Sequence, residues 1–367
     1  MGWAWKGSGL SPEQEEETRA ALEAAAQDET ALTSAASAQL EGVARNVPAL
    51  KFLFDICGSW ERVLYLAKHL ARATFALPYQ ENLWTRGPGS NGKDTLANLM
   101  LALLGDYFSN LPCEALTGGR EMDAPSQTLL ALRGKRFVAV REIARTAKIR
   151  SHVYKTISDP KGVIKARGLY GKDEEFSPHF LLYMASNVPV EIDDSSGGSA
   201  RRTRIIDLPF NFVENPQEAN ERQRDAGIEE LFPAWRAGLF HLLLEVYNRF
   251  LRGRPQSNIT PVPQDIQEAV DEELREEWME MLVGFVAGSL VPATSPGDAS
   301  SAADVRGAFC AYAAGVVPKK EVGLRLSRKG FAEESVNYWQ GATRTRKRVY
   351  RLKFPDGSAA LARLRTR

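Results

Sequence analysis

The sequence of 367 residues is poor in the residues that build metal centres and disulfide frameworks. It contains only three cysteines and four histidines, scattered along the chain without C-x-x-C or comparable spacing. The cysteines are therefore expected to stay reduced, and neither a disulfide-stabilised fold nor a zinc site is predicted. Such sparse cysteine usage is typical of proteins in a reducing compartment.

A charge imbalance and a long apolar run are also missing. The net charge of +1 gives no global reason to expect a nucleic acid or a membrane surface as partner, so any such signal has to be local. Every apolar run is interrupted by charge before it could cross a bilayer, and no signal peptide opens the sequence. We therefore expect a soluble, intracellular, cytoplasmic protein without a membrane partner.

With 44% hydrophobic residues the chain can bury a sizeable core, and four regions differ in composition. Residues 1–80 are expected to be helical and to serve in packing or oligomerisation, beginning with the capping box SPEQ at 11–14. Residues 81–215 alternate short apolar runs with helical stretches, which is typical of a parallel α/β sheet. A helical region is predicted over 216–290, and a small basic module over 300–367 after a linker.

The stretch GPGSNGKDT, residues 87–95, matches the phosphate-binding pattern G-x-x-x-x-G-K. It lies between a predicted strand, 82–86, and a predicted helix that ends at Gly105, so backbone N–H groups would converge on an anion. Asp94 stands where a serine or threonine hydroxyl usually binds magnesium, and either its carboxylate or the Thr95 hydroxyl is the candidate ligand. The candidate nucleotide-binding residues are Gly87, Gly89, Ser90, Asn91, Gly92, Lys93, Asp94 and Thr95.

Two further apolar strands are predicted to end in polar side chains at the same edge of the sheet. The run Phe137 to Val140 leads to Glu142, which would orient or deprotonate an attacking water. Many such strands end in two acids, but here Arg141 takes the first place. The second run, HFLLYMASN, ends at Asn187, whose amide would position the water.

Basic residues gather in two stretches around Asn187. KGVIKARGLYGKDEEF, residues 161–176, alternates and turns at Gly171, which predicts a basic hairpin. GGSARRTRIIDLPF carries Arg201, Arg202 and Arg204 ahead of an apolar strand. A guanidinium supplied across a subunit boundary is a recurring way to stabilise the charge of phosphoryl transfer, whereas the alternative for these arginines is plain surface charge.

The C-terminal module concentrates positive charge in a chain that is nearly neutral. From Pro318 to Phe354 eleven basic residues stand against three acidic ones, a net charge of +8. Two predicted helical stretches are followed by TRTRKRVYRLKF, a predicted strand pair with aromatics among the bases, and together they resemble a winged helix. Such a patch would bind phosphate backbones without reading sequence.

In this order, GPGSNGKDT, LRGKRFVAVRE, KARGLYGKDEEFSPHFLLYMASN and ARRTRIIDLPF resemble the superfamily 3 helicases, in particular the phage and plasmid primase C-terminal helicases and the poxvirus primase-helicase. The resemblance covers residues 50–215 and, more loosely, 303–354. It implies an AAA+-like P-loop ATPase core that uses ATP and Mg²⁺, homo-hexameric rings, and translocation on DNA during viral, phage or plasmid replication. A host nucleus is then an alternative to the cytoplasm.

The resemblance also assigns roles by position. It implies that Lys93 and Thr95 belong to the phosphate loop and that Glu142 belongs to the acidic motif. It also implies that Asn187 is the sensor, and that Arg201 or Arg202 is the arginine finger. Because the basic hairpin places positive charge where phosphates could pass, we expect Lys165, Arg167 and Lys172 to line a central channel for DNA. The family often carries a primase domain upstream; nothing ahead of these motifs is long enough for one, so we expect a separate primase or none.

Two other functions compete with a helicase. A nucleotide or nucleoside kinase shares the phosphate loop but needs an arginine-bearing lid and an acceptor pocket, and the sequence indicates neither. A DNA-binding replication or packaging factor whose ATPase has decayed at Asp94 is the second. Basal and DNA-stimulated ATPase rates would separate the three.

Overall fold

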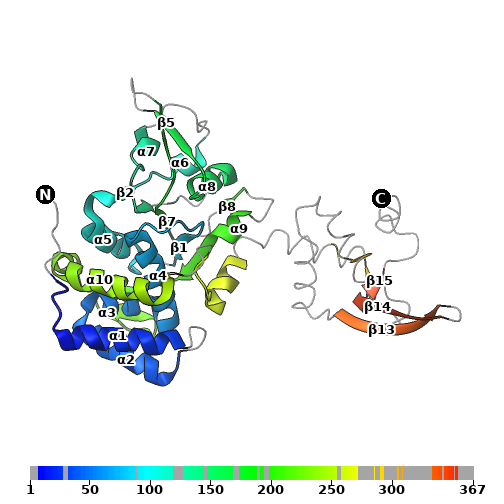
Figure 1. Ribbon diagram of the computed structural model, residues 1–367, viewed down its shortest axis with the longest axis horizontal. Coiled ribbons are helices and arrows are strands. Elements are labelled where there is room, and N and C mark those ends of the chain that lie inside the picture. Colours follow the sequence, from blue (N-terminus) through cyan, green and yellow to red (C-terminus); the bar gives the residue numbers. More distant parts are fainter. Residues whose placement is uncertain are drawn as a thin grey trace. The chain divides into compact units, whose positions relative to one another are not determined.

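The computed structural model describes residues 7–27, 32–87, 89–118, 127–141, 143, 147–167, 173–187, 191–193, 198–253 and 258–271, and then 285, 290–292, 304–305, 308, 333–340, 343–350 and 352–353. The chain divides into two compact units, residues 1–194 with 198–273, and residues 195–197 with 274–367 (Figure 1). The motifs for nucleotide chemistry all fall in the first unit.

Four helices open the first unit: α1 (Pro12–Gln27), α2 (Ser34–Asn46), α3 (Pro48–Cys57) and α4 (Trp60–Thr74). The predicted capping box at α1 is confirmed, because the Ser11 N–H donates to Gln14 Oε1 at 2.8 Å and the Gln14 N–H donates to Ser11 Oγ at 3.2 Å. Helix α3 ends at Gly58, whose φ of 75° is left-handed. The helical periodicity of this region therefore predicted its structure correctly.

A five-stranded sheet forms the centre of the unit, in the order β2-β3-β7-β1-β9. Every neighbouring pair is parallel, which confirms the predicted mixed α/β fold with a parallel sheet. Strands β3 and β7 are buried along their whole length, because helices and connecting segments cover both faces of a parallel sheet. The strands are β1 (Asn82–Arg86), β2 (Phe108–Asn110), β3 (Phe137–Val140), β7 (Leu181–Ser186) and β9 (Thr203–Asp207).

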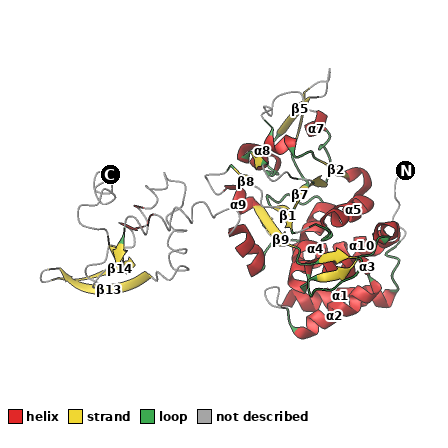
Figure 2. Cartoon of the chain, turned by 180° about the vertical axis from the view of Figure 1, so that it is seen from behind, coloured by secondary structure: helices red, strands yellow, loops and turns green. Residues whose placement is uncertain are grey.

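Helix α5 (Lys93–Leu104) follows β1, and α10 (Phe232–Val246) packs against α3, α4 and α5. Short segments flank these helices: η1 (Gly105–Tyr107) leads into β2, η2 (Ile228–Leu231) precedes α10, and η3 (Tyr247–Leu251) continues it. In both views α1 to α4 and α10 lie together below the sheet (Figures 1 and 2). Their buried side chains form one core with those of the sheet.

Smaller elements lie at the opposite end of the unit (Figures 1 and 2). They include α6 (Glu114–Thr117), α7 (Gln127–Leu130) and α8 (Ser151–Ile157). The short strands β4 (Lys148–Ile149) and β8 (Glu191–Ile192) pair in parallel. Strands β5 (Ile164–Arg167) and β6 (Asp173–Phe176) pair antiparallel, which confirms the strands of the predicted hairpin. Helix α9 (Gly198–Arg202) leads directly into β9.

The region predicted as helical, 216–290, contains a strand as well. Strand β10 (Asn211–Val213) pairs in parallel with β11 (Glu221–Gln223), and helix resumes at η2, at α10 and over residues 264–271. The strand inside this region, β11, has the wholly polar sequence ERQ, so no apolar alternation in the sequence indicates it.

In the second unit, four strands are described. Strand β13 (Glu333–Gln340) pairs antiparallel with β14 (Thr343–Tyr350), and β12 (Val291–Pro292) pairs antiparallel with β15 (Leu352–Lys353). The two strands predicted in TRTRKRVYRLKF are therefore present as β14 and β15, but each pairs with an earlier strand and not with the other. Most of the predicted helical stretches before them lie outside the described residues, so the winged helix stays a prediction.

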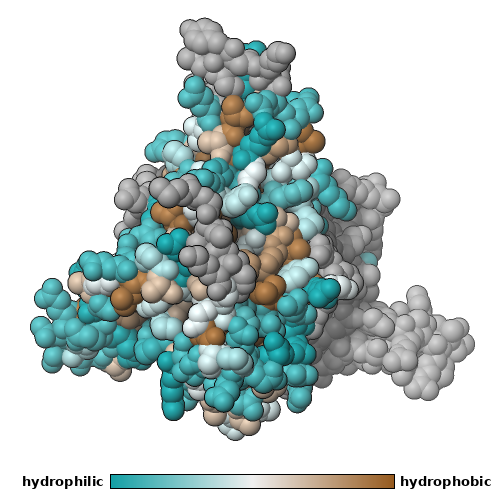
Figure 3. Space-filling view, turned by 60° about the vertical axis from the view of Figure 1, so that its left-hand side comes forward, coloured by the Kyte–Doolittle hydropathy of each residue, from teal (hydrophilic) through white to brown (hydrophobic). Residues whose placement is uncertain are grey.

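The surface seen in Figure 3 is largely hydrophilic, and its hydrophobic residues form separate patches. In the part of the chain that the structure describes, no helix combines the length and the apolar character needed to cross a membrane.

Candidate functional site

The predicted phosphate loop joins the carboxyl end of β1 to the amino end of α5. Lys93 is the first residue of α5, and Gly92 precedes it with a φ of 87° and no side-chain cap. The first N–H groups of an α-helix have no partner within the helix, and they carry its positive end. Strand, loop and helix thus follow one another in the order that an anion site requires.

Two glycines of the loop leave no room for a side chain. A Cβ on Gly87 would lie 2.3 Å from Asn91 Nδ2 and 2.8 Å from the Leu208 carbonyl oxygen. A Cβ on Gly92 would lie 2.6 Å from Ile56 Cγ2, and the φ of Gly92 is left-handed. At these two positions the loop therefore packs against neighbouring atoms of the protein so closely that only glycine fits.

The Lys93 side chain folds back over this loop. Its Nζ donates to Asn91 Oδ1 at 2.7 Å and to the Gly87 carbonyl at 3.1 Å. Burial lowers the pKa of Lys93, while the neighbouring Asp94 carboxylate acts in the opposite direction. Asn91 is buried, and its Nδ2 has no hydrogen-bond partner among the described residues. The loop thus holds a poorly hydrated ammonium and an unused amide donor, which suits a phosphate ligand.

Two buried side chains tie the start of α5 to the sheet. The Tyr183 hydroxyl on β7 donates to the Lys93 carbonyl at 2.8 Å, and Thr85 Oγ1 donates to the Tyr183 oxygen at 2.6 Å. Burial raises the pKa of Tyr183, so its hydroxyl keeps the proton that it donates. The role of Tyr183 is not predictable from the sequence, because within HFLLYMASN it is indistinguishable from the other apolar residues of a strand.

Asp94 and Thr95 differ in their surroundings. Asp94 is exposed on the first turn of α5, whereas Thr95 is half-buried and lines a cavity. Among the described residues no group of three or more His, Cys, Asp and Glu could hold a metal ion. A magnesium ion at this loop would therefore depend on phosphate oxygens as well as on one of these two residues.

Glu142 lies outside the described residues, so its role in preparing water stays a prediction. Arg141, directly after β3, is described: its Nη1 donates to Asn98 Oδ1 on α5 at 2.9 Å, and its guanidinium carbon lies 5.8 Å from the Phe108 ring centroid. Asn98 Nδ2 in turn donates to Glu229 Oε1 at 2.9 Å. Arg141 thus braces β3 against α5 at the place where many such strands carry an acid.

Asn187 lies at the same edge of the sheet as the loop. Strand β7 stands between β1 and β3, and its Ser186 is paired with Arg86 of β1. Asn187 is therefore level with Gly87, and it is exposed. The structure brings the predicted sensor and the phosphate loop together.

The predicted arginines lie at the opposite edge. Asn82 of β1 is paired with Thr203 of β9, so Arg201 and Arg202 precede the amino end of β9 while the loop follows the carboxyl end of β1. At about 3.3 Å per residue, roughly 15 Å of strand separates the two edges. Arg201 is exposed, and Arg202 Nη1 donates to the Gly198 carbonyl of its own helix at 3.0 Å.

The predicted DNA-binding hairpin carries acids opposite its bases. Lys165 and Arg167 are exposed on β5 and are paired across the hairpin with Glu175 and Asp173 of β6. Lys165 Nζ lies 3.1 Å from Glu175 Oε1. Lys172 and the Gly171 turn lie outside the described residues.

A cavity of about 640 Å³ opens beside the loop, lined in part by Ser90, Gly92 and Thr95. Its aromatic walls come from other elements: Phe52 of α3, Phe212 of β10 and Trp235 of α10. The Phe52 and Trp235 ring centroids are 6.5 Å apart. No motif in the sequence indicates this cavity, because its walls come from segments far apart in the chain that only the fold assembles.

Comparison with known proteins gives distant relatives. No protein-family model matches the chain. It is similar to the protein named "Putative primase C962R" of African swine fever virus, with 29% identity over 178 residues, which are 48% of this chain and 18% of that protein. It is also similar to "Putative helicase L207/L206" of Acanthamoeba polyphaga mimivirus, with 25% identity over 175 residues, 45% of this chain and 18% of that protein.

Solved structures show a weaker likeness. The apo structure of the NrS-1 C-terminal region is 16% identical, with a TM-score of 0.43 over 82% of this chain and 74% of that one. The chain spans about a fifth of the length of the curated relatives that it matches. It is thus a distant relative of segments of viral proteins that are named primase and helicase.

Proposed function

We propose that this chain is an ATP-dependent DNA helicase of the superfamily 3 type, acting in viral, phage or plasmid replication. The names of its relatives support a replication role. One observation carries the proposal: the predicted phosphate loop lies at the carboxyl ends of the parallel strands, whereas an exposed arginine, Arg201, lies at their amino ends.

At the loop, the side chains suit a nucleoside triphosphate with magnesium. Lys93 and the first N–H groups of α5 would hold the phosphates, and Asn91 Nδ2 offers a further donor. The cavity lies within the size range of ligand pockets, and its aromatic walls suit a base and ribose. The nucleotide would supply the phosphoanhydride bond that is hydrolysed. Glu142 would orient or deprotonate the attacking water, and the Asn187 amide would help to position it. Asp94 or Thr95 would ligate the metal.

Arg201 is too far from the loop of its own chain to stabilise phosphoryl transfer there, because the sheet separates them. In a ring of copies joined head to tail, the arginine of one copy would reach the loop of the next. A hexamer is the assembly that the helicase resemblance implies. Arg201 is the better candidate of the two arginines, since Arg202 donates to its own helix.

DNA contacts are proposed at two places. The C-terminal module, with its local net charge of +8, would bind the phosphate backbone. Lys165, Arg167 and Lys172 would contribute at the hairpin, although Glu175 offsets part of the charge of Lys165. A separate primase remains a proposed partner.

The test measures ATP hydrolysis with and without DNA for the wild type, Lys93→Ala, Arg201→Ala and Arg202→Ala. We expect Lys93→Ala to lose nucleotide binding, and Arg201→Ala to bind nucleotide and assemble while its turnover falls about a thousandfold. Transfer of the γ-phosphoryl group of ATP to a nucleoside or nucleotide would favour the kinase. Nucleotide binding without any hydrolysis in the wild type would favour the decayed factor.

Mixing Lys93→Ala, which keeps the arginine, with Arg201→Ala, which keeps the loop, tests the shared site. In rings formed from equal amounts, half of the loops are intact and half of the arginines facing them are intact, so about a quarter of the sites are complete. Activity should therefore return to at most about a quarter of the wild-type rate. No recovery, although mixed rings are shown to form by native mass spectrometry, would refute the shared site.

A further inference from the structure

A buried ion pair lies next to the exposed arginine. Arg204, the second residue of β9, is 7% exposed, and its Nη2 lies 2.6 Å from Oε1 of Glu81, which is fully buried just before β1. Removing two charges from water is unfavourable, and their attraction offsets this only if the geometry is good and the remaining polar atoms have hydrogen-bond partners. The surroundings of the pair meet this condition.

Arg204 uses every side of its guanidinium. Its Nε donates to the Tyr65 hydroxyl of α4 at 3.1 Å, and its Nη1 donates to the carbonyls of Arg201 at 3.2 Å and Thr203 at 2.9 Å. The carboxylate of Glu81 and the hydroxyl of Tyr65 raise the pKa of Arg204 against the opposing effect of burial. One charged group thus joins α4, the segment before β1, and the end of α9.

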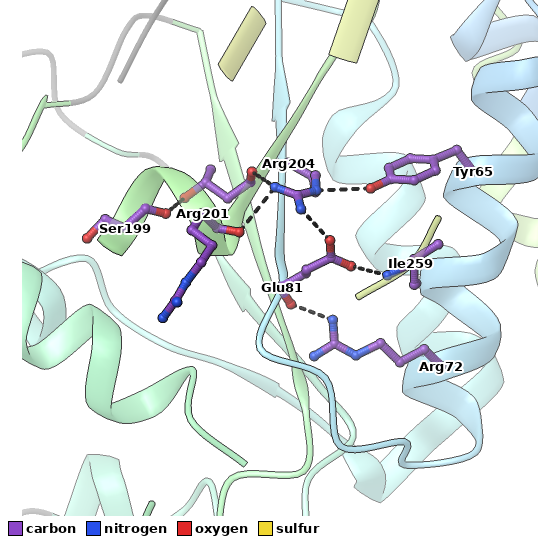
Figure 4. Close-up of polar contacts among 8 residues, drawn as sticks. Tyr65, Arg72, Glu81, Ser199, Arg201, Arg204 and Ile259 are labelled. Atoms are coloured by element: carbon purple, nitrogen blue, oxygen red, sulfur yellow. Dashed lines mark hydrogen bonds and ion pairs between the residues drawn. The ribbon is translucent and has the colours of Figure 1, made fainter. Parts of the chain in front are cut away.

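Glu81 is held equally firmly. Its Oε2 accepts from the Ile259 N–H at 2.7 Å, and its carbonyl accepts from Arg72 Nη1. Arg72 Nη2 donates to the Tyr79 carbonyl at 2.8 Å, which fixes the turn that carries Glu81. Figure 4 shows these contacts converging on the pair from α4, the segment before β1 and the segment around Ile259.

Helix α9 depends on such contacts for its direction. It has only five residues, and a helix of that length is not stable by its own hydrogen bonds. Its carbonyl at Arg201 is fixed by Arg204, while the Arg201 side chain points away from the network (Figure 4) and is exposed. The network therefore fixes the backbone from which an exposed guanidinium projects.

We propose that Glu81 and Arg204 are positioning residues for Arg201: the buried pair sets the direction in which Arg201 leaves the end of α9 toward the loop of the neighbouring copy. This inference rests on the proposed shared site. It assigns a functional role to two residues that touch neither the loop nor the cavity. A misplacement of about 1 Å in a group that stabilises a transition state commonly costs up to a hundredfold in rate.

The test places the change on one side of the shared site at a time. The baseline is the mixture of Lys93→Ala, which supplies the arginine, with Arg201→Ala, which supplies the loop. Glu81→Gln, which keeps the shape of the side chain and removes its charge, is then added either to the arginine supplier or to the loop supplier. We expect about a tenfold loss of the recovered activity in the first mixture and none in the second.

A gentler variant covers the case in which Glu81→Gln fails to fold. Tyr65→Phe removes only the hydroxyl that accepts from Arg204, and we expect it to lower the recovered activity a few-fold, again only in the arginine supplier. Tyr154→Phe is the matched control: it removes a buried hydroxyl 2.7 Å from Thr203 Oγ1, and Thr203 keeps its bond to the Ser199 carbonyl. We expect no side-specific loss from it.

The outcomes separate the two proposals. An equal loss on both sides, or no loss on either, overturns the positioning role and leaves the shared site intact, because the baseline mixture is still active. A baseline mixture that recovers no activity overturns the shared site and the positioning role together. Unchanged nucleotide affinity in every Glu81→Gln protein with an intact loop, measured by titration, supports an effect on turnover and not on binding.

Discussion

His69 should make the first unit sensitive to acid. It lies on α4 with no exposed surface, and neither ring nitrogen has a hydrogen-bond partner among the described residues. Burial lowers the pKa of His69 well below its ordinary value of 6.5, and the positive charges of Arg72, Arg204 and Lys68 lower it further. The folded protein therefore keeps the ring neutral at pH values where the unfolded chain protonates it.

The sign and size follow from proton linkage. Below pH 6.5 the unfolded state binds a proton that the folded state does not, so the free energy of unfolding falls as the pH falls. One unit below that pH the loss is about 1.4 kcal/mol, and two units below it the loss is about 2.7 kcal/mol. Above pH 7.5 the contribution to pH dependence vanishes, because both states are then neutral (roughly one unit above the ordinary pKa).

The perturbation is His69→Phe, which keeps an aromatic ring against Tyr65, whose ring centroid lies 4.9 Å away. Urea unfolding followed by tryptophan fluorescence at pH 7.5, 6.5, 5.5 and 4.5 gives the free energy of unfolding of variant and wild type (values chosen to span about three units around the ordinary pKa). We expect the wild type to lose about 1.4 kcal/mol more than the variant between the first and third pH values. His152→Gln, on the exposed face of α8, is the control. Parallel pH profiles for wild type and His69→Phe would refute the reasoning.

Four further sets of substitutions test the candidate nucleotide site and the C-terminal module. Gly92→Ala should weaken ATP binding at least about tenfold in a titration, because a Cβ would lie 2.6 Å from Ile56 Cγ2, whereas Gly89→Ala, with nothing within 4 Å, should cost much less. Trp235→Leu should weaken ATP binding about tenfold and leave inorganic tripolyphosphate binding unchanged, because tripolyphosphate has no base or ribose to contact the aromatic wall of the cavity. Asp94→Ala should raise the magnesium concentration needed for hydrolysis and Asp94→Ser should restore it; a magnesium titration indifferent to both changes would leave Thr95 as the ligand. Replacing Arg344, Arg346 and Arg348 by Gln should reduce the slope of log affinity for duplex DNA against log salt by up to about 3, and an unchanged slope would exclude these residues as phosphate contacts.

The elements of the site followed from local patterns. Strand β1 has the predicted bounds 82–86, and α5 ends before Gly105 as predicted, because a short apolar run and a helical apolar period are both properties of neighbouring residues. Gly87 and Gly92 were predicted as part of the phosphate-binding pattern, and both lie where a Cβ would collide with neighbouring atoms of the protein. Glu142, although predicted, lies outside the described residues and stays a prediction.

The burial of Arg204 could not be predicted from local sequence patterns. The sequence groups it with Arg201 and Arg202 ahead of a strand, but it lies inside β9 and is buried. Its partner Glu81 is far away in sequence, and a lone glutamate before a strand is normally a surface residue. Tyr183 and the aromatic walls of the cavity escaped prediction for the same reason: their roles depend on contacts that only the assembled fold makes.

Strand β1 links the candidate nucleotide site to the buried ion pair. Strand β1 has five residues, with Glu81 and its buried ion pair before it and the phosphate loop after it. It is hydrogen-bonded to β7, which Asn187 follows, and to β9, which contains Arg204 and is preceded by Arg201 and Arg202 in α9. At its carboxyl end Arg86 holds Asp207 of β9 through two contacts, at 2.7 and 2.9 Å. Because a buried parallel strand resists bending, a displacement of the loop would be transmitted along β1 to the end at which Glu81 and Arg204 are proposed to position Arg201, and in the proposed ring this would couple each site to the next.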